Sequence, residues 1–115
     1  DLCAIIAEND IAEAAIEQVF TSNNRRTAIA VGRASGVAML AIAGAGLPLA
    51  EYTPTQVKAA VCGYGGADKA QVRKAVSRRL GLQTVGGPAD VADAIAVALC
   101  HAQGMRMHRI QEQVR

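Results

Sequence analysis

Two carboxylates near the start of a predicted helix are the residues in this sequence best suited to metal chemistry. The segment from Pro88 to His101 reads PADVADAIAVALCH. Proline suits a first helical turn, and Asp90 and Asp93 are three residues apart, so they share one face of the helix. Carboxylate oxygens are the ligands that Mg²⁺ prefers in proteins. The helix macrodipole alone also favours acids at this place, so both interpretations stay open.

A third acid, Glu17, interrupts the apolar run from Ala14 to Phe20, which reads AAIEQVF. The length of this run and its Ile, Val and Phe predict a buried strand. A carboxylate inside such a strand is costly unless it is paired or holds a metal. The alternative is that the strand opens to solvent at Glu17, because acids are seldom fully buried.

Basic residues that could contact phosphate lie on two further predicted helices. Lys58 belongs to a short helix that follows a nearly complete capping box at Thr53–Gln56. Lys69 and Arg73 share one face of a helix predicted from Asp68 to Leu80, because they are four residues apart. A basic row of this kind is most often a solvated helix face, and nucleic-acid contact is the alternative.

Apolar spacing predicts which faces of the last two helices are buried. The aliphatic face of the last helix is expected to pack on a sheet and consists of Val91, Ile95 and Leu99. The buried stripe of the helix before it is predicted to be Val72, Val76 and Leu80, with Gly81 as the stop signal.

The predicted elements follow the order helix, strand, helix, strand, helix, helix, helix. A short helix over residues 1–9 precedes the first strand, a long helix runs from Thr27 to Gly44, and a second strand runs from Leu47 to Tyr52. A strand, a long helix and a second strand form a βαβ crossover, so the fold class is α/β. Residues 102–115 are predicted to form a polar, frayed helical tail.

Gly32 and Gly36 lie four residues apart in the long predicted helix. Small residues at this spacing allow two helices to approach closely. The contact could join two copies of the chain or lie within one domain, and the spacing alone leaves both possibilities open.

Composition limits the class of protein. The chain has 115 residues, which is one domain at most, and a net charge of +2, which permits an acidic partner. Its three cysteines lie far apart without C-x-x-C spacing, which indicates free thiols and a cytoplasmic location. The charge-free run from Ala34 to Ala50 is shorter than the roughly 20 residues that a spanning helix needs, so no membrane association is expected.

Five segments, in order along the chain, together resemble the RuvC family of Holliday junction resolvases, the crossover junction endodeoxyribonucleases. The segments are AIEQVF at Ala15–Phe20, G-x-A-x-G-V-A at Gly32–Ala38, YTPTQVKAAV at Tyr52–Val61, G-x-G-x-A-D-K-A-Q-V at Gly63–Val72, and D-x-x-D-A-x-A-x-A-x-C-H at Asp90–His101. Any one of them is weak, but five at the family spacing are specific.

The resemblance implies a ribonuclease H-like fold in a homodimer, in which each subunit cuts one strand of a four-way DNA junction with Mg²⁺ or Mn²⁺. Glu17, Asp90 and Asp93 match three of the four metal-binding acids of the family. The fourth, an aspartate in a D-P-G motif, is not in this sequence. The chain is therefore expected to be a single nuclease domain over residues 1–115 that lacks the N-terminal third of the family fold.

The resemblance also implies roles for residues outside the metal site. Lys58 and Lys69 match lysines that bind DNA phosphate, and Phe20 matches an aromatic residue that contacts bases near the crossover. The segment around Gly32 and Gly36 matches the dimer helix, although its arginine is moved by two places relative to the common G-Q-A-R-G. A branch-migration helicase complex is a further partner that the family suggests.

Two rival functions remain at this point. The missing aspartate favours a catalytically inactive protein that binds junction DNA on the same scaffold. The glycine spacing favours a structural helical module that oligomerises through Gly32 and Gly36.

Overall fold

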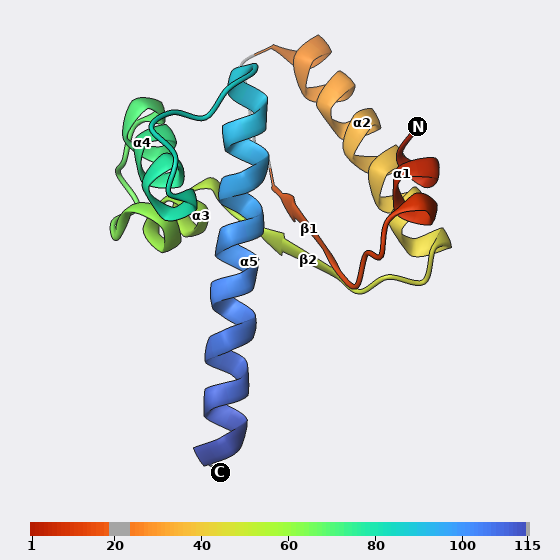
Figure 1. The fold of residues 1–115 in the computed structure, drawn as a ribbon. Coiled ribbons are helices and arrows are strands. Elements are labelled where there is room, and N and C mark those ends of the chain that lie inside the picture. Colours follow the sequence, from red (N-terminus) through yellow and green to blue (C-terminus); the bar gives the residue numbers. More distant parts are fainter. Residues whose placement is uncertain (19–23, 115) are drawn as a thin grey trace. The chain divides into compact units, whose positions relative to one another are not determined.

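The computed structural model, which describes residues 1–18 and 24–114, has the predicted order of helices and strands (Figure 1). The elements are α1 (Leu2–Glu8), β1 (Ala14–Glu17), α2 (Arg25–Gly44), β2 (Leu49–Tyr52), α3 (Pro54–Cys62), α4 (Lys69–Leu80) and α5 (Ala89–Val114). The chain divides into two compact units, Asp1–Glu51 and Tyr52–Arg115. A single nuclease domain over the whole chain stays a prediction.

The first unit contains the predicted βαβ crossover. β1 and β2 form a two-stranded sheet, and their arrows point the same way in Figure 1. α2 connects the two strands, and α1 packs beside α2. β1 ends at Glu17, which is earlier than the predicted end of the strand at Phe20, and Phe20 itself lies outside the described residues.

α2 is longer than its apolar pattern predicts because Asn24 caps it. The Asn24 side chain accepts hydrogen bonds from the backbone amides of Arg26 and Thr27, and the helix then continues for 20 residues. By length and composition α2 could cross a membrane. The charge-free run counted from Ala34 underestimates this length because the helix begins at Arg25, and the absence of membrane association stays a prediction.

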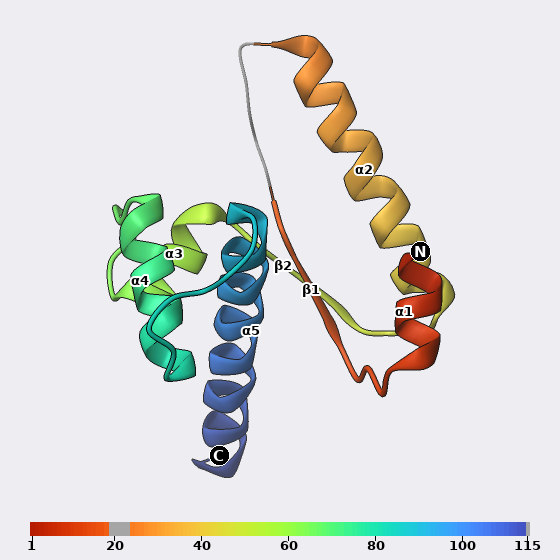
Figure 2. The same ribbon diagram turned by 45° about the horizontal axis from the view of Figure 1, so that its top comes forward.

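The second unit is a small helical bundle. α3 and α4 pack against α5 and against each other, and Figure 1 and Figure 2 both show the three helices side by side. Its core is built almost entirely from small side chains, which let the helices approach closely. The buried residues are Val57, Val61, Ala67, Val72, Val76, Ser77, Val85, Ala92, Ala96, Val97 and Cys100.

The buried face of α5 differs from the predicted one by a rotation of one residue. Val91 is 40% exposed and Ile95 and Leu99 are only half-buried, so the predicted aliphatic face is wrong. The buried residues of α5 are Ala92, Ala96, Val97 and Cys100. α3 and α4 cover this face, because alanines leave room for two helix backbones that longer side chains would hold away. Packing of α5 on a sheet stays a prediction.

The predicted caps of α3 and α4 are confirmed. Thr53 with Gln56 and Asp68 with Gln71 each form a complete capping box, and Gly81 ends α4 at a left-handed φ of 69°. A left-handed backbone suits glycine because it has no Cβ.

The predicted burial is wrong for one residue of the α4 stripe. Leu80 is 43% exposed, and Ser77 is buried in its place. The Ser77 hydroxyl donates a hydrogen bond of 3.0 Å to the carbonyl oxygen of Arg73, which satisfies it in the interior.

α5 continues without a break to Val114. The predicted tail is therefore helical, and its side chains are exposed from Ala102 onwards except for half-buried Met105. The aspartate-bearing end of α5 packs on α4, while the other end extends beyond the bundle (Figure 1).

Candidate metal and nucleic-acid site

The two aspartates predicted to bind metal lie near the N-terminus of α5. Asp90 is in the first turn and is exposed, and Asp93 follows one turn later and is half-buried. Ala92 between them is only 3% exposed, so packing against the bundle fixes the orientation of this turn. The helix thus presents one solvated and one partly enclosed carboxylate.

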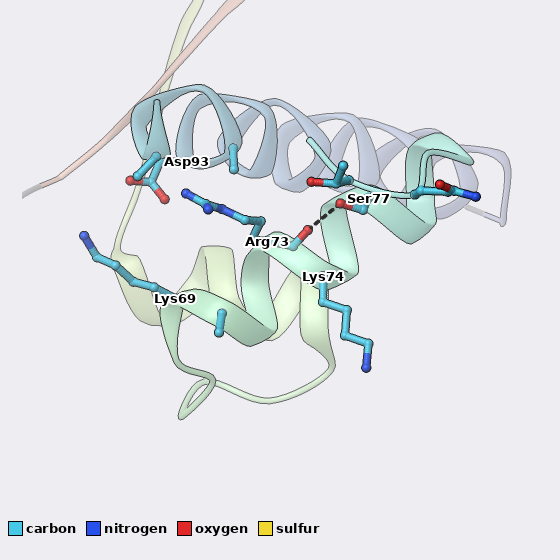
Figure 3. A pocket seen from close by; sticks show the side chains of 10 residues that line it. Lys69, Arg73, Lys74, Ser77 and Asp93 are labelled. Atoms are coloured by element: carbon cyan, nitrogen blue, oxygen red, sulfur yellow. Dashed lines mark hydrogen bonds between the residues drawn. The ribbon is translucent and has the colours of Figure 1, made fainter. Parts of the chain in front are cut away.

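Asp93 lines a pocket of about 430 Å³ between α4 and α5. Lys69, Arg73 and Lys74 of α4 line the same pocket, together with Ser77 at its floor. Figure 3 shows the side chains of Lys69 and Arg73 turned toward the space in front of Asp93. The pocket therefore brings a predicted metal ligand and two predicted DNA-binding residues together.

The charges of this pocket suit a phosphate group. Two cations, those of Lys69 and Arg73, face one carboxylate, with the stem of Lys74 at the pocket edge, and Arg73 forms no ion pair with Asp93 within the described chain. An anion would offset the excess positive charge, and a guanidinium group can hold two phosphate oxygens at once. A divalent cation on the carboxylates would add to this attraction, because the phosphate oxygens could coordinate it.

The donor set on α5 fits a magnesium ion only in part. Among the described residues, no three His, Cys, Asp or Glu side chains form a group that could hold a metal ion. Mg²⁺ is commonly held by one or two carboxylates together with waters and substrate phosphates. Asp90 and Asp93 supply two carboxylates, and the adjacent basic pocket suits the phosphate.

Glu17, the third predicted acid, is the last residue of β1 and is half-buried. It belongs to the first compact unit, whereas Asp90 and Asp93 belong to the second. The convergence of all three acids on one ion therefore stays a prediction.

Three other predicted site residues do not line the pocket. Lys58 is half-buried in α3 and does not line it. Gly32 and Gly36 are exposed on α2, and a Cβ atom built on either would meet nothing within 4 Å in the described chain. Packing within the described residues therefore does not explain this glycine pair.

The contact between Tyr52 and His101 was not predicted from the sequence. The Tyr52 hydroxyl and the His101 Nδ1 atom are 2.6 Å apart, and the two rings tilt against each other with centroids 5.7 Å apart. This hydrogen bond links the end of β2 to the middle of α5. No local spacing signals it, because the two residues lie 49 positions apart in the chain.

An α/β fold that places carboxylates beside a basic pocket is typical of proteins that act on phosphodiesters with a divalent cation. The family "Crossover junction endodeoxyribonuclease RuvC" matches residues 1–101. The chain belongs to this RuvC family, as the five sequence segments indicated.

Curated relatives and solved structures agree with this family. The chain is 54% identical over 101 residues to the RuvC crossover junction endodeoxyribonuclease of Chloroflexus aggregans, covering 88% of the chain and 62% of that protein. It is 50% identical over 104 residues to that of Desulfitobacterium hafniense, covering 90% and 63%. The chain thus spans about three fifths of the length of these relatives.

The structure of RuvC from Thermus thermophilus is similar with a TM-score of 0.83 and 36% identity, over 93% of this chain and 64% of that one. The same protein in complex with a Holliday junction substrate gives a TM-score of 0.85 at 36% identity, over 93% and 65%. These similarities show that the chain has the ribonuclease H-like α/β fold of RuvC.

Proposed function

We propose that the protein is a structure-selective endonuclease that resolves four-way DNA junctions by metal-dependent hydrolysis of phosphodiesters in recombination and repair. The pocket that joins Asp93 to Lys69 and Arg73 carries this proposal. Family membership supports it, since the curated relatives above are named crossover junction endodeoxyribonucleases and one similar structure holds a Holliday junction substrate.

Each site residue has a role in this proposal. Asp90, Asp93 and Glu17 would hold Mg²⁺, with Mn²⁺ as an alternative ion. A bound divalent cation supplies Lewis-acid chemistry that favours attack by water and stabilises the leaving 3′ oxygen. Lys69 and Arg73 hold the phosphate of the strand in front of Asp93, and their charges offset that of the phosphate. Lys58 and Phe20 remain proposed DNA contacts.

A homodimer is the proposed assembly, because a symmetric junction needs two cuts. α2 is the proposed interface: Gly32 and Gly36 are open, and Val37 and Leu40 are 69% and 74% exposed. Exposed apolar surface of this kind is typical of a protein interface. A cytoplasmic location and a contact with a branch-migration helicase complex complete the proposal.

The rival functions receive less support. A catalytically inactive DNA-binding protein would share the basic pocket, but the relatives above bear the names of nucleases. A purely structural helical module gives no reason for the two cations, Lys69 and Arg73, that face Asp93.

Cleavage of a synthetic four-way junction tests the proposal. The protein containing this chain, incubated with the junction and Mg²⁺, should produce paired symmetric nicks, and EDTA should abolish them. Asp93→Asn should lower the cleavage rate by about 10²-fold or more, since a removed electrostatic contact in an active site costs about that much. The matched control is Glu112→Gln, which changes an exposed acid at the far end of α5 and should cleave normally.

The outcomes separate the rivals. Binding of the junction without nicks would favour the inactive DNA-binding protein. Absence of junction binding, with normal behaviour of the Asp93→Asn variant in every other respect, would favour the structural module.

A further inference from the structure

α4 carries a second row of cations that the proposed site does not use. Lys74 and Arg78 are four residues apart and therefore neighbours on the helix surface, with Gln71 one turn before them. Successive residues of an α-helix differ by about 100° around its axis, so this row is rotated from the row of Lys69 and Arg73. Figure 3 shows the Lys74 side chain leaving α4 away from Asp93, although its stem touches the edge of that pocket.

This second row borders a pocket of its own. The pocket has a volume of about 220 Å³ and lies between α4 and the end of α3, where Tyr64, Gln71, Lys74 and Arg78 contribute its polar groups. No acid is among the described residues that line it, and neither Lys74 nor Arg78 forms an ion pair in the described chain. Ammonium, guanidinium, phenol and amide groups together offer several donors and no negative charge, which suits an anion.

The loop after α3 holds Tyr64 at this pocket. Gly63 ends α3 with a φ of 90°, and Gly65 lies so close to α3 that a Cβ atom on it would come within 2.6 Å of the Thr55 methyl carbon. A side chain at this position would force the Thr55 side chain to shift, so glycine suits this close approach of the loop to α3. Tyr64 is 49% exposed and projects from it beside the cations.

Arg79 illustrates the difference between a structural and an available cation. Its guanidinium donates a hydrogen bond of 3.1 Å to the carbonyl oxygen of Ala60, which ties α4 to α3. Arg78, the next residue back, has no such bond within the described chain and instead lines the open pocket. Its charge is available for a ligand.

We infer that the pocket of Tyr64, Lys74 and Arg78 binds a backbone phosphate of a second DNA segment, separate from the strand held at Asp93. The inference rests on the proposed function and deepens it. A pocket of about 220 Å³ is smaller than the roughly 300–1,000 Å³ of small-molecule sites, so it suits one group of a large ligand.

DNA is the favoured source of this phosphate rather than an acidic protein. Both cationic rows lie on one short helix, so a nucleic acid that reaches the first row lies near the second. A four-way junction presents several duplex arms around one point, and two rows in different directions can contact two of them. A linear duplex offers a single direction of approach.

The salt dependence of junction binding tests this inference. The variant is the double substitution Lys74→Ala and Arg78→Ala in the protein containing this chain, and the dissociation constant is measured by fluorescence anisotropy between 50 and 200 mM salt. Loss of two phosphate contacts should reduce the slope of log affinity against log salt by about 1.8, at about 0.9 per contact. Single-turnover cleavage at saturating junction should stay within about twofold of wild type, because neither residue faces the reacting phosphate.

The matched control is Arg106→Ala with Arg109→Ala, which removes two exposed cations from α5 and should leave the slope unchanged. An unchanged slope in the Lys74 and Arg78 variant would overturn the inference and leave the proposed function intact. An equal reduction of the slope in the control variant would also overturn the inference, because the reduction would then follow from the change in net charge. If the wild-type protein fails to bind the junction, the proposed function fails first and the inference with it.

Discussion

At the scale of single residues, the hydrogen bond between Tyr52 and His101 is a polar contact between the last residue of β2 and α5. Both side chains are half-buried, and Gly104 one turn further along α5 lies beside the phenol. A Cβ atom on Gly104 would lie 3.6 Å from the Tyr52 hydroxyl oxygen. The pair therefore holds the middle of the helix whose first turns carry the two aspartates.

Removal of the Tyr52 hydroxyl should destabilise the fold. Tyr52→Phe leaves the imidazole without this partner, and the free energy of unfolding should fall by about 1–2 kcal/mol. Urea denaturation followed by circular dichroism measures the change. Tyr64→Phe is the matched control, because Tyr64 is 49% exposed, and it should unfold like wild type. Equal stability of the two variants would show that the Tyr52 bond contributes nothing.

Cysteine reactivity should differ with burial. Cys3 is exposed, whereas burial raises the pKa of the Cys100 thiol, whose sulfur donates to the Gln56 carbonyl oxygen. At pH 8 the Cys100 thiolate should be rarer, so iodoacetamide should label Cys100 at least about tenfold more slowly than Cys3. Mass spectrometry measures both rates, and labelling in denaturant should remove the difference.

The same pKa shift gives the sign of a stability effect. The unfolded thiol ionises at about pH 8.5 and the folded thiol at a higher pH, so this contribution to stability is complete below about pH 8.5 and falls as the pH rises above it. If the contribution of Cys100 to the free energy of unfolding rose between pH 8 and 10, the raised pKa of its thiol would be contradicted.

At the scale of elements, α5 combines a close-packed half with an exposed half. Its buried face is made of alanines and Cys100 with Val97, and this face meets both α3 and α4. Small side chains at such a crossing leave little room for a larger group. The position of Asp93 in front of α4 thus depends on how closely these helices approach.

Overpacking of this face should be costly. Ala96 is 1% exposed, so Ala96→Leu should lower the free energy of unfolding by about 1–3 kcal/mol. It should also weaken junction binding, because α4 and its lysines would shift relative to Asp93. Ala98→Leu is the control on the exposed face of the same helix and should change stability by less than about 0.5 kcal/mol. Thermal denaturation of the two variants decides the matter.

At the scale of the whole molecule, the apolar surface of α2 needs a cover that the described chain does not provide. Only Ile42 of its 20 residues is buried, and Ile29, Val37 and Leu40 are each more than half exposed. The proposed homodimer accounts for this surface, and paired subunits also account for two cuts in one junction.

A charge on this surface should dissociate the dimer. Leu40→Glu places a carboxylate at a residue that is 74% exposed in the single chain, and the dimer dissociation constant should rise by about tenfold or more. Sedimentation velocity measures the assembly. Val114→Glu alters an 81% exposed residue of α5 and should leave the dimer intact. A wild-type protein that is monomeric at micromolar concentration would refute the homodimer itself.

The caps at the ends of α3 and α4 were predictable from the sequence alone. The helix caps act through hydrogen bonds that span at most a few residues. Residue types and spacing therefore determine where α3 begins (Thr53 with Gln56), where α4 begins (Asp68 with Gln71) and where α4 ends (Gly81). The family likeness was predictable for a similar reason, since five short motifs keep their order and spacing.

Only the tertiary structure decided which surfaces meet. The choice of Ala92 and Ala96 over Val91 and Ile95 as the buried face of α5 depends on how closely α3 and α4 approach, which helical periodicity does not encode. The bond between Tyr52 and His101 likewise arises from packing between distant segments. Hydrogen bonds within a turn join residues that are close in the sequence, so the sequence predicts them. Contacts between helices depend on the shapes of both helix surfaces, which are distant in the sequence.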